Sequence, residues 1–146
     1  MSTTGLDTFD RTLQVTHIWL DEIMAESGPD RQVAWHILTA VLHALRDRLP
    51  LELAVHLGAQ LPILVRGAYY DQWHIGVEPE HYRSLEEFLK QVGQGLRGTR
   101  PINRTKAVRA VFGVLDRHVT EGQLDKVREA LPEEVRMIWN EGALQA

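Results

Sequence analysis

The chain is 146 residues long, which is a common size for one domain and is enough to bury a hydrophobic core without crosslinks. It contains no cysteine, so disulfides, thiolate metal sites and a cysteine nucleophile are excluded, and we expect a cytoplasmic protein. The net charge of −4 argues against a dedicated nucleic-acid-binding protein, since affinity for phosphates depends on a basic surface.

Membrane association is not expected either. The amino-terminal segment lacks a charged region followed by an apolar run, so it does not resemble a signal peptide or an anchor. The longest mostly apolar stretch, residues 57–65, is interrupted by Gln60 and Pro62. It is far shorter than the roughly 20 residues that a membrane-spanning helix needs.

Apolar residues recur at helical spacing along most of the chain, and no strand-like alternation of useful length competes with them. Within residues 31–48, for example, Ile37, Val41 and Leu45 fall on one side of a helix, as expected of a buried face. Proline, glycine and capping residues indicate where the helices end. These patterns predict eight helices, near residues 6–26, 31–48, 51–60, 62–72, 84–96, 103–119, 121–130 and 132–141.

Four polar residues are predicted to cap helices at their amino-terminal ends, among them Asp30, which follows Gly28 and Pro29. Ser84 and Thr120 are followed three residues later by Glu87 and Gln123, which is the spacing of a capping box. Asn103 follows a proline and can accept hydrogen bonds from the first turn of the next helix.

The sequence contains an internal repeat with an offset of 70 residues and no gap. Identical residues occupy Ala40 and Ala110, Val41 and Val111, Leu45 and Leu115, Leu61 and Leu131, Pro62 and Pro132, Val65 and Val135, and Arg66 and Arg136. We therefore predict an all-α fold. Two tandem repeats of a three-to-four-helix unit, residues 1–76 and 77–146, should pack as one pseudo-symmetric helical bundle.

Four of the repeated residues are predicted to be structural. Pro62 and Pro132 would occupy the first turn of a helix, where the missing N–H costs nothing. Arg66 and Arg136 follow one turn later and can bind either a carboxylate or the carboxyl-terminal end of a helix. The candidate carboxylate partners are Asp47 and Asp116.

Several segments of the first repeat are similar to a known family. They are Thr16-His17-Ile18-Trp19-Leu20, Val41-Leu42-His43-Ala44-Leu45-Arg46-Asp47-Arg48-Leu49-Pro50, His56-Leu57-Gly58-Ala59-Gln60-Leu61-Pro62, Arg66-Gly67-Ala68-Tyr69-Tyr70 and Trp73. These segments resemble the signature of a bacterial family catalogued as domain of unknown function 2267, and the match covers nearly the whole chain. The chain departs from the family at Gln72, where members usually have a glycine before the linking tryptophan.

The resemblance implies a duplicated helical fold, a cytoplasmic location and a stress-related role. It brings no established activity, cofactor or catalytic residue that could be transferred to this chain.

Three His/carboxylate pairs with i,i+4 spacing occur in the first repeat and are absent 70 residues later. On a helix this spacing places both side chains on one face, and helical bundles hold iron, manganese or zinc with such ligands. The candidate metal ligands are His17, Asp21, His43, Asp47 and His56, the last paired with Glu52. Because the first two pairs face away from the apolar side of their helices, a site would require these faces to meet another surface.

A basic segment is the second candidate site. No Asp or Glu occurs from residue 88 to 115, and the predicted helix start near Asn103 would add backbone N–H groups that favour an anion. The candidate phosphate-binding residues are Arg97, Arg100, Arg104, Lys106 and Arg109. No aromatic residue that could stack on bases lies between Phe88 and Phe112, so nucleic acid is not the expected ligand.

An aromatic cluster at the repeat junction has two interpretations. Tyr69, Tyr70, Trp73 and Tyr82 either line a ligand pocket between the halves or seal the junction by burying their rings.

The chain shows no convergent nucleophile and base, and no phosphate-binding loop preceded by a strand. We therefore interpret it as a non-enzymatic interaction or scaffolding protein without a cofactor, whose partner is an unidentified protein or a second copy. The alternatives are a helical metalloprotein that binds a transition metal through the five candidate ligands, and a weak nucleic-acid-binding protein that uses the basic segment.

Overall fold

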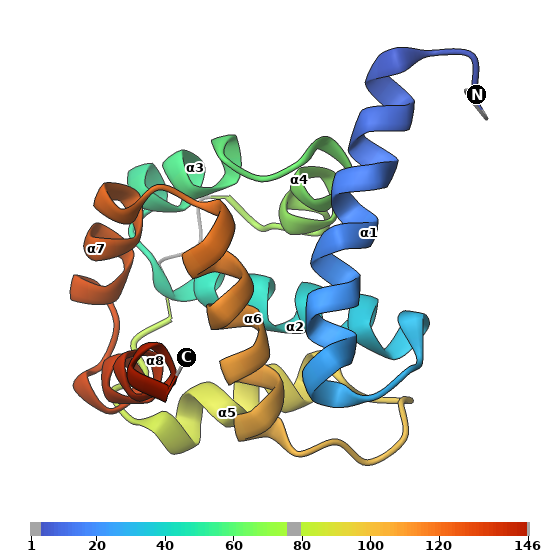
Figure 1. The fold of residues 1–146 in the computed structure, drawn as a ribbon. Helices are drawn as coiled ribbons and strands as arrows, with labels where there is room; N and C mark the ends of the chain where they lie inside the picture. The colour runs from blue at the N-terminus through green and yellow to red at the C-terminus, as the bar shows by residue number, and fades with distance from the viewer. Residues whose placement is uncertain (1–3, 76–79, 146) are drawn as a thin grey trace.

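The computed structural model describes residues 4–75 and 80–145, and these residues form eight α-helices (Figure 1). The helices are α1 (Asp7–Ser27), α2 (Arg31–Arg48), α3 (Leu51–Ala59), α4 (Ile63–Tyr70), α5 (Leu85–Gly95), α6 (Arg104–His118), α7 (Glu121–Glu129) and α8 (Glu133–Gln145). The predicted all-α fold is confirmed, and every predicted helix is present. The largest difference is at α8, which continues to residue 145 instead of ending near residue 141.

Polar side chains cap three of the helices at their amino-terminal ends. The Asp30 carboxylate accepts two amide hydrogen bonds from the first turn of α2, and the Asn103 side chain accepts one from the first turn of α6. Ser84 accepts a hydrogen bond of 3.2 Å from the amide of Glu87 at the start of α5. Each bond satisfies a backbone donor that the helix leaves without an intrahelical partner.

The predicted cap at Thr120 is wrong, because this side chain makes no capping bond at α7. Its hydroxyl instead accepts a hydrogen bond of 3.0 Å from Nε2 of Gln60, and its amide donates one of 2.9 Å to Oε1 of the same glutamine. Gln60 directly follows α3, so this reciprocal pair joins α3 to α7.

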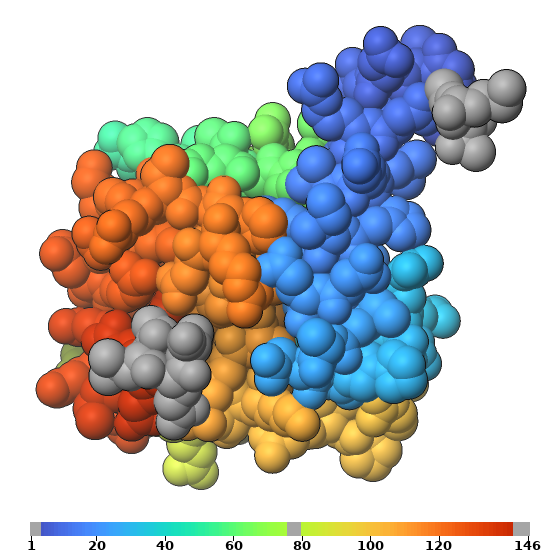
Figure 2. Space-filling model, in the orientation of Figure 1, coloured from blue at the N-terminus to red at the C-terminus, as the bar shows by residue number. Residues whose placement is uncertain are grey.

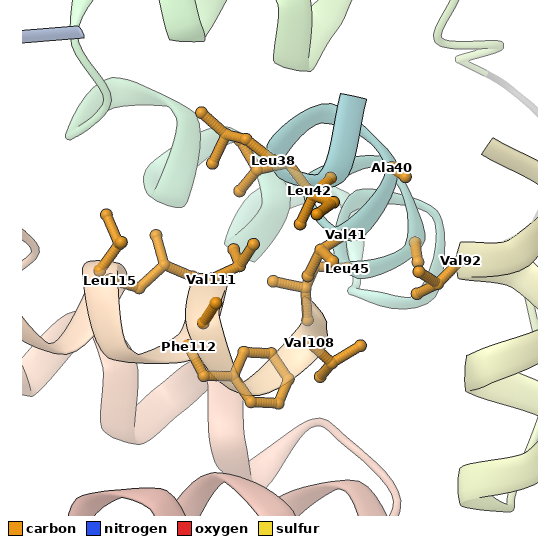
Figure 3. Packing of buried hydrophobic residues seen from close by; sticks show 14 of the residues in the cluster. Leu38, Ala40, Val41, Leu42, Leu45, Val92, Val108, Val111, Phe112 and Leu115 are labelled. Carbon is orange, nitrogen blue, oxygen red and sulfur yellow. The ribbon is translucent and has the colours of Figure 1, made fainter. Parts of the chain in front are cut away.

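The core lies between α2 and α6, which face each other near the centre of the molecule (Figure 3). The facing side chains are fully or almost fully buried, and they include Leu38, Val41, Leu42 and Leu45 of α2 and Val108, Val111, Phe112 and Leu115 of α6. They repeat every three or four residues, so the predicted apolar face of α2 is its buried face.

An outer helix of each half packs against the central helix of the other half, an arrangement here called crosswise packing. Helix α5 packs most extensively against α2, and α1 packs most extensively against α6. The approach of α5 to α2 is close, since a β-carbon at Gly95 would lie 2.8 Å from the β-carbon of Ala40. Each half therefore supplies a helix to the core of the other, and the 1–76 and 77–146 units share one hydrophobic core.

Helix positions recur at the 70-residue offset that the sequence indicates. Helix α7 has the bounds of α3 moved by 70 residues, and α8 begins 70 residues after α4. Pro62 and Pro132 immediately precede α4 and α8. Arg66 donates hydrogen bonds from Nη2 to the carbonyl oxygens of Ala59 and Leu61, and Arg136 Nη2 donates to that of Leu131.

The two arginines therefore bind carbonyl groups at the ends of α3 and α7 instead of the candidate carboxylates. Asp47 binds Nε of Arg46 at 2.8 Å. Asp116 binds Arg128 at 2.7 Å and accepts a hydrogen bond of 2.8 Å from the indole of Trp139.

Gln72 is in the left-handed region of backbone conformation, with a φ of 59°. Glycine adopts this conformation without strain, whereas other residues adopt it rarely. The turn after α4 therefore explains why a glycine suits this position and why Gln72 is an unfavourable substitute.

Aromatic rings pack against one another within the second half, and further rings are buried at the junction of the two halves. The rings of Phe112 and Trp139 stack with centroids 3.9 Å apart, and Phe88 lies 6.2 Å from Phe112 on centroids. At the junction Tyr69 and Tyr82 are buried, and their hydroxyls donate to the carbonyl oxygens of Ala54 and Ala44. These two rings contribute to the core.

The amino-terminal end of α1 projects beyond the other helices, as the space-filling view shows (Figure 2). None of the helices in the described part of the chain is both long and apolar enough to cross a membrane.

Candidate functional site

The structure places the five candidate metal ligands on three helices and does not bring them together. Asp21 on α1 pairs with Arg31 at 3.6 Å, and Asp47 on α2 pairs with Arg46. His17 on α1 and His56 on α3 are exposed. No group of three or more His, Asp or Glu side chains that could hold a metal ion occurs in residues 4–75 and 80–141. Metal binding by these residues stays a prediction.

His43 differs from the other candidate ligands because it lies in a helix interface. Its Nε2 donates a hydrogen bond of 2.6 Å to the carbonyl oxygen of Ala68 in α4, so the proton is on Nε2 in the neutral ring. Burial lowers the pKa of His43 from its ordinary value of 6.5, although the bond to Ala68 opposes this effect. The sequence places His43 on the side of α2 opposite its apolar face, and in the structure this side packs against α4 of the same half.

The lowered pKa gives a prediction for stability against pH. Below pH 6.5 the unfolded chain binds a proton at this position more readily than the folded chain, so the free energy of unfolding should fall as the pH falls. Above pH 6.5 this contribution should be constant. We expect His43→Gln to lose less stability than the wild type between about pH 7.5 and about pH 5.5, measured by urea unfolding.

The matched control for this prediction is His56→Gln, because His56 is exposed. It should show the wild-type dependence on pH. Equal losses for the wild type and His43→Gln would contradict the role given to burial of the imidazole.

The five candidate cations of the basic segment are exposed, but two of them have partners. Arg100 donates a hydrogen bond of 3.3 Å to the carbonyl oxygen of Ser27, and Arg109 pairs with Glu141 at 3.3 Å. Arg97 and Arg104 are exposed near the end of α5. Lys106 lies on α6, where it lines a cavity of about 900 Å³ together with Arg109.

That cavity contains both signs of charge. It is lined by Arg117 and Arg128 as well as the two candidate cations, and by the acidic residues Glu26, Asp116 and Glu121. Three carboxylates beside the cations make it a poor surface for a phosphate backbone. Nucleic-acid binding by the basic segment stays a prediction.

Exposed apolar side chains collect at one end of the molecule. Among the described residues, ten large hydrophobic side chains are exposed, and seven of them belong to the start of α1, to α3 or to α4. These seven residues, here called the end face, are Leu6, Phe9, Leu13, Leu51, Val55, Ile63 and Leu64. The three segments lie together at the top of Figure 1, and the Thr12 hydroxyl accepts a hydrogen bond from the amide of Leu64.

The end face has no apolar counterpart in the second half of the chain. At the 70-residue offset, five of its residues are replaced by charged residues, all exposed. The pairs are Leu13 and Arg83, Leu51 and Glu121, Val55 and Asp125, Ile63 and Glu133, and Leu64 and Glu134. The charged residues of the second half are suited to contact with water. The apolar residues at the same positions of the first half are not, which suggests that another molecule covers this surface.

A second feature of the same end is a cavity of about 570 Å³, here called the α1 cavity. It lies between the first half of α1 and the turn that joins α3 to α4. Its lining residues are Asp7, Thr8, Arg11, Thr12, Val15 and Trp19 of α1, Gln60, Leu61, Pro62, Ile63 and Arg66 of the α3–α4 region, and His118 of α6.

His118 is held in place at the edge of the α1 cavity by two contacts. Its ring stacks on that of Trp19 with centroids 5.3 Å apart, and its Nε2 lies 2.6 Å from Oε2 of Glu22. The other carboxylate oxygen of Glu22 accepts a hydrogen bond of 2.7 Å from Arg117. The imidazole therefore has a fixed orientation beside the cavity.

Sequence reasoning missed both the end face and the α1 cavity. The identical residues of the two repeats are mostly buried and structural, so they carry no information about the surface. The differences at exposed positions, such as Ile63 and Glu133, would have indicated the end face. The α1 cavity depends on contacts between α1, α4 and α6, which no local pattern predicts.

Comparison with known families assigns the chain to a family. The model of the family described as "Uncharacterized conserved protein (DUF2267)" matches residues 16–138. The chain belongs to this family. The DUF2267 match includes α2 to α7 entirely, and it begins within α1 after the projecting end that carries Leu6, Phe9 and Leu13. No curated protein shows a significant match to the sequence.

Proposed function

We propose that this protein is a non-enzymatic interaction protein that associates with a second copy of itself through the end face. The observation that carries the proposal is the group of seven exposed apolar side chains at one end, most of which are replaced by charged residues 70 residues later. We place the protein in the cytoplasm, in keeping with its lack of cysteine.

The start of α1 contributes three exposed apolar side chains to this surface. Leu6 is 53% exposed and Phe9 is 54% exposed, because both lie at the helix end that projects beyond the body of the protein (Figure 2). A short projecting helix is only marginally stable in water unless its apolar face is packed. Contact with another molecule would remove these side chains from water and stabilise the helix.

Antiparallel pairing of two α1 helices would bury the apolar side chains of this helix against each other. Leu6, Phe9, Leu13 and the exposed His17 follow one another at helical spacing, so they form one stripe along α1. If Leu13 of both copies lies at the twofold axis, Phe9 of one copy is opposite His17 of the other, and their rings can pack together. Such a contact is closed, because each copy contributes the same surface.

The experiment is light scattering coupled to size-exclusion chromatography over roughly a hundredfold range of protein concentration, since a dimer dissociates on dilution. We expect the mass of a dimer at the higher concentrations. The double variant Phe9→Asp with Leu13→Asp should be monomeric throughout. Its circular dichroism should match that of the wild type, because neither side chain is part of the core.

The matched control is Ile18→Asp. Ile18 is on the same helix and is 44% exposed, but it lies on the opposite side from Leu13. This variant should remain dimeric. A wild type that stays monomeric at every concentration would overturn self-association, and a dimer that survives the double variant would show that another surface is used.

A further inference from the structure

We infer that the α1 cavity is a binding site for a small carboxylic acid with an apolar body. The inference goes beyond self-association, because the cavity and the apolar stripe of α1 lie on different sides of that helix. Val15 and Trp19 line the cavity, whereas Leu6 and Leu13 do not.

The size and composition of the cavity suit a small organic molecule. Its volume of about 570 Å³ falls within the range of ligand pockets, which runs from roughly 300 to 1,000 Å³. Val15, Leu61, Pro62 and Ile63 provide apolar surface along its walls. A ligand that fills it would therefore need an apolar portion.

The polar side chains of the cavity mainly offer hydrogen-bond donors. Trp19 is 1% exposed, and its indole N–H has no hydrogen-bond acceptor among the described residues. The same is true of the Nε–H group of Arg66. A buried donor without an acceptor is unfavourable, and native proteins avoid this arrangement. Both atoms are almost completely covered in this structure, so an acceptor brought by a ligand satisfies them only if the cavity wall moves slightly.

The unsatisfied donor of Trp19 is stronger evidence for a ligand site than that of Arg66. Arg136, which makes a similar helix-end contact, also has a buried Nε–H group without an acceptor and does not line this cavity. The orphan donor of an arginine is therefore a feature of both helix ends. At the 70-residue offset from Trp19 the chain has Leu89, so the unsatisfied indole belongs to this site alone.

Charge at the opening favours an anion. Arg11 lines the cavity, is exposed and makes no ion pair or hydrogen bond with any residue that the structure describes. With Arg66 it gives two positive charges among the lining residues, against one negative charge on Asp7. A guanidinium donates two parallel hydrogen bonds to a carboxylate, so Arg11 can bind the acid group of a ligand at the cavity opening.

The equivalent position in the second half differs in a way that explains the open space. Thr12 lines the cavity, and 70 residues later the chain has Tyr82. The ring of Tyr82 is buried, packs 5.8 Å from Phe88 and has the guanidinium of Arg48 above it at 5.5 Å. A small residue in place of a large ring leaves volume that a ligand can occupy.

The test is titration of the full-length protein with octanoate, observed by the indole N–H signals in a ¹H–¹⁵N correlation spectrum. The chain has four tryptophans, and Trp19→Phe assigns the signal of Trp19. We expect octanoate to shift this signal in a saturable manner. Octan-1-ol, which has the same apolar body without the charge, should bind at least about tenfold more weakly.

Two variants test the location. Val15→Phe should weaken binding, because the larger side chain narrows the cavity without removing a polar group. Arg11→Gln should weaken binding by about tenfold, because it removes the charge and leaves an exposed polar side chain. The matched control is Arg83→Gln, which removes an exposed arginine outside the cavity and should bind octanoate as the wild type does.

Four outcomes would overturn the inference. One is the absence of any shift at the Trp19 signal with octanoate in the folded wild type. Equal binding of octanoate and octan-1-ol would show that the cavity binds the apolar chain and does not recognise the carboxylate. Undiminished binding by Val15→Phe would place octanoate elsewhere, for example on the end face. Tighter binding of inorganic phosphate than of octanoate would make the site one for phosphate groups.

Discussion

Neither half of the chain is expected to fold alone. Separate fragments of residues 1–76 and 77–146 should show little helical signal in circular dichroism and no cooperative unfolding transition. The reason is the crosswise packing, in which α5 covers α2 and α1 covers α6. A fragment of residues 1–76 would leave the fully buried face of α2, including Leu38 and Leu45, exposed to water.

Mixing the two fragments should restore the native helical signal, and they should elute together in equal amounts. The loss on separation should be the whole stability of the domain, on the order of 5 to 15 kcal/mol. The intact chain is the control. A fragment of residues 1–76 that unfolds cooperatively by itself would contradict the shared core and would make the two repeats independent domains.

Phe112→Ala should be strongly destabilising and should lower the free energy of unfolding by about 3 to 5 kcal/mol. Phe112 is 2% exposed and stacks on Trp139 at a centroid distance of 3.9 Å, so its removal leaves a cavity at the centre of the fold. Urea unfolding followed by tryptophan fluorescence would measure the change in the free energy of unfolding.

Ile18→Ala is the matched control for this prediction, because it removes an aliphatic side chain that is 44% exposed. It should change stability by no more than about 0.5 kcal/mol. A loss below about 1 kcal/mol for Phe112→Ala would show that the ring stack with Trp139 contributes much less than its burial implies.

Most of the helical architecture could be predicted from the sequence. Helices α2 and α6 have apolar residues every three or four positions and polar caps at Asp30 and Asn103, so both their extent and their buried faces follow from local patterns. The end of α8 is harder to place. Gly142 directly follows the predicted end, where a glycine commonly stops a helix, but α8 continues through it to residue 145.

Contacts between helices distant in sequence could not be predicted. The capping-box spacing predicts that Thr120 caps its own helix, but Gln60 approaches it from α3 and binds its hydroxyl. The pattern within α2 places His43 opposite the apolar face, but it contains no information about α4, whose Ala68 carbonyl accepts the hydrogen bond from the imidazole. Both differences arise because tertiary packing supplies partners that a single helix does not contain.

The candidate sites likewise depend on contacts between helices that the sequence does not predict. Correct i,i+4 spacing places His17 near Asp21 and His43 near Asp47, but whether such pairs converge depends on how α1 and α2 cross. In the structure Asp21 and Asp47 each bind an arginine instead. The cations of the basic segment are exposed, although the partners of Arg100 and Arg109 come from α1 and α8.

The crosswise packing also has a consequence for folding during synthesis. Helix α2 is complete once Arg48 has left the ribosome, but its buried face is covered only after α5 and α6 have followed, which requires the 70 residues up to His118. At ordinary rates of translation this interval is roughly 4 to 14 s. Helices α1 and α4 also pack against α2, so during that time the nascent chain presents a partly uncovered apolar helix, which makes it a substrate for chaperones that bind such segments.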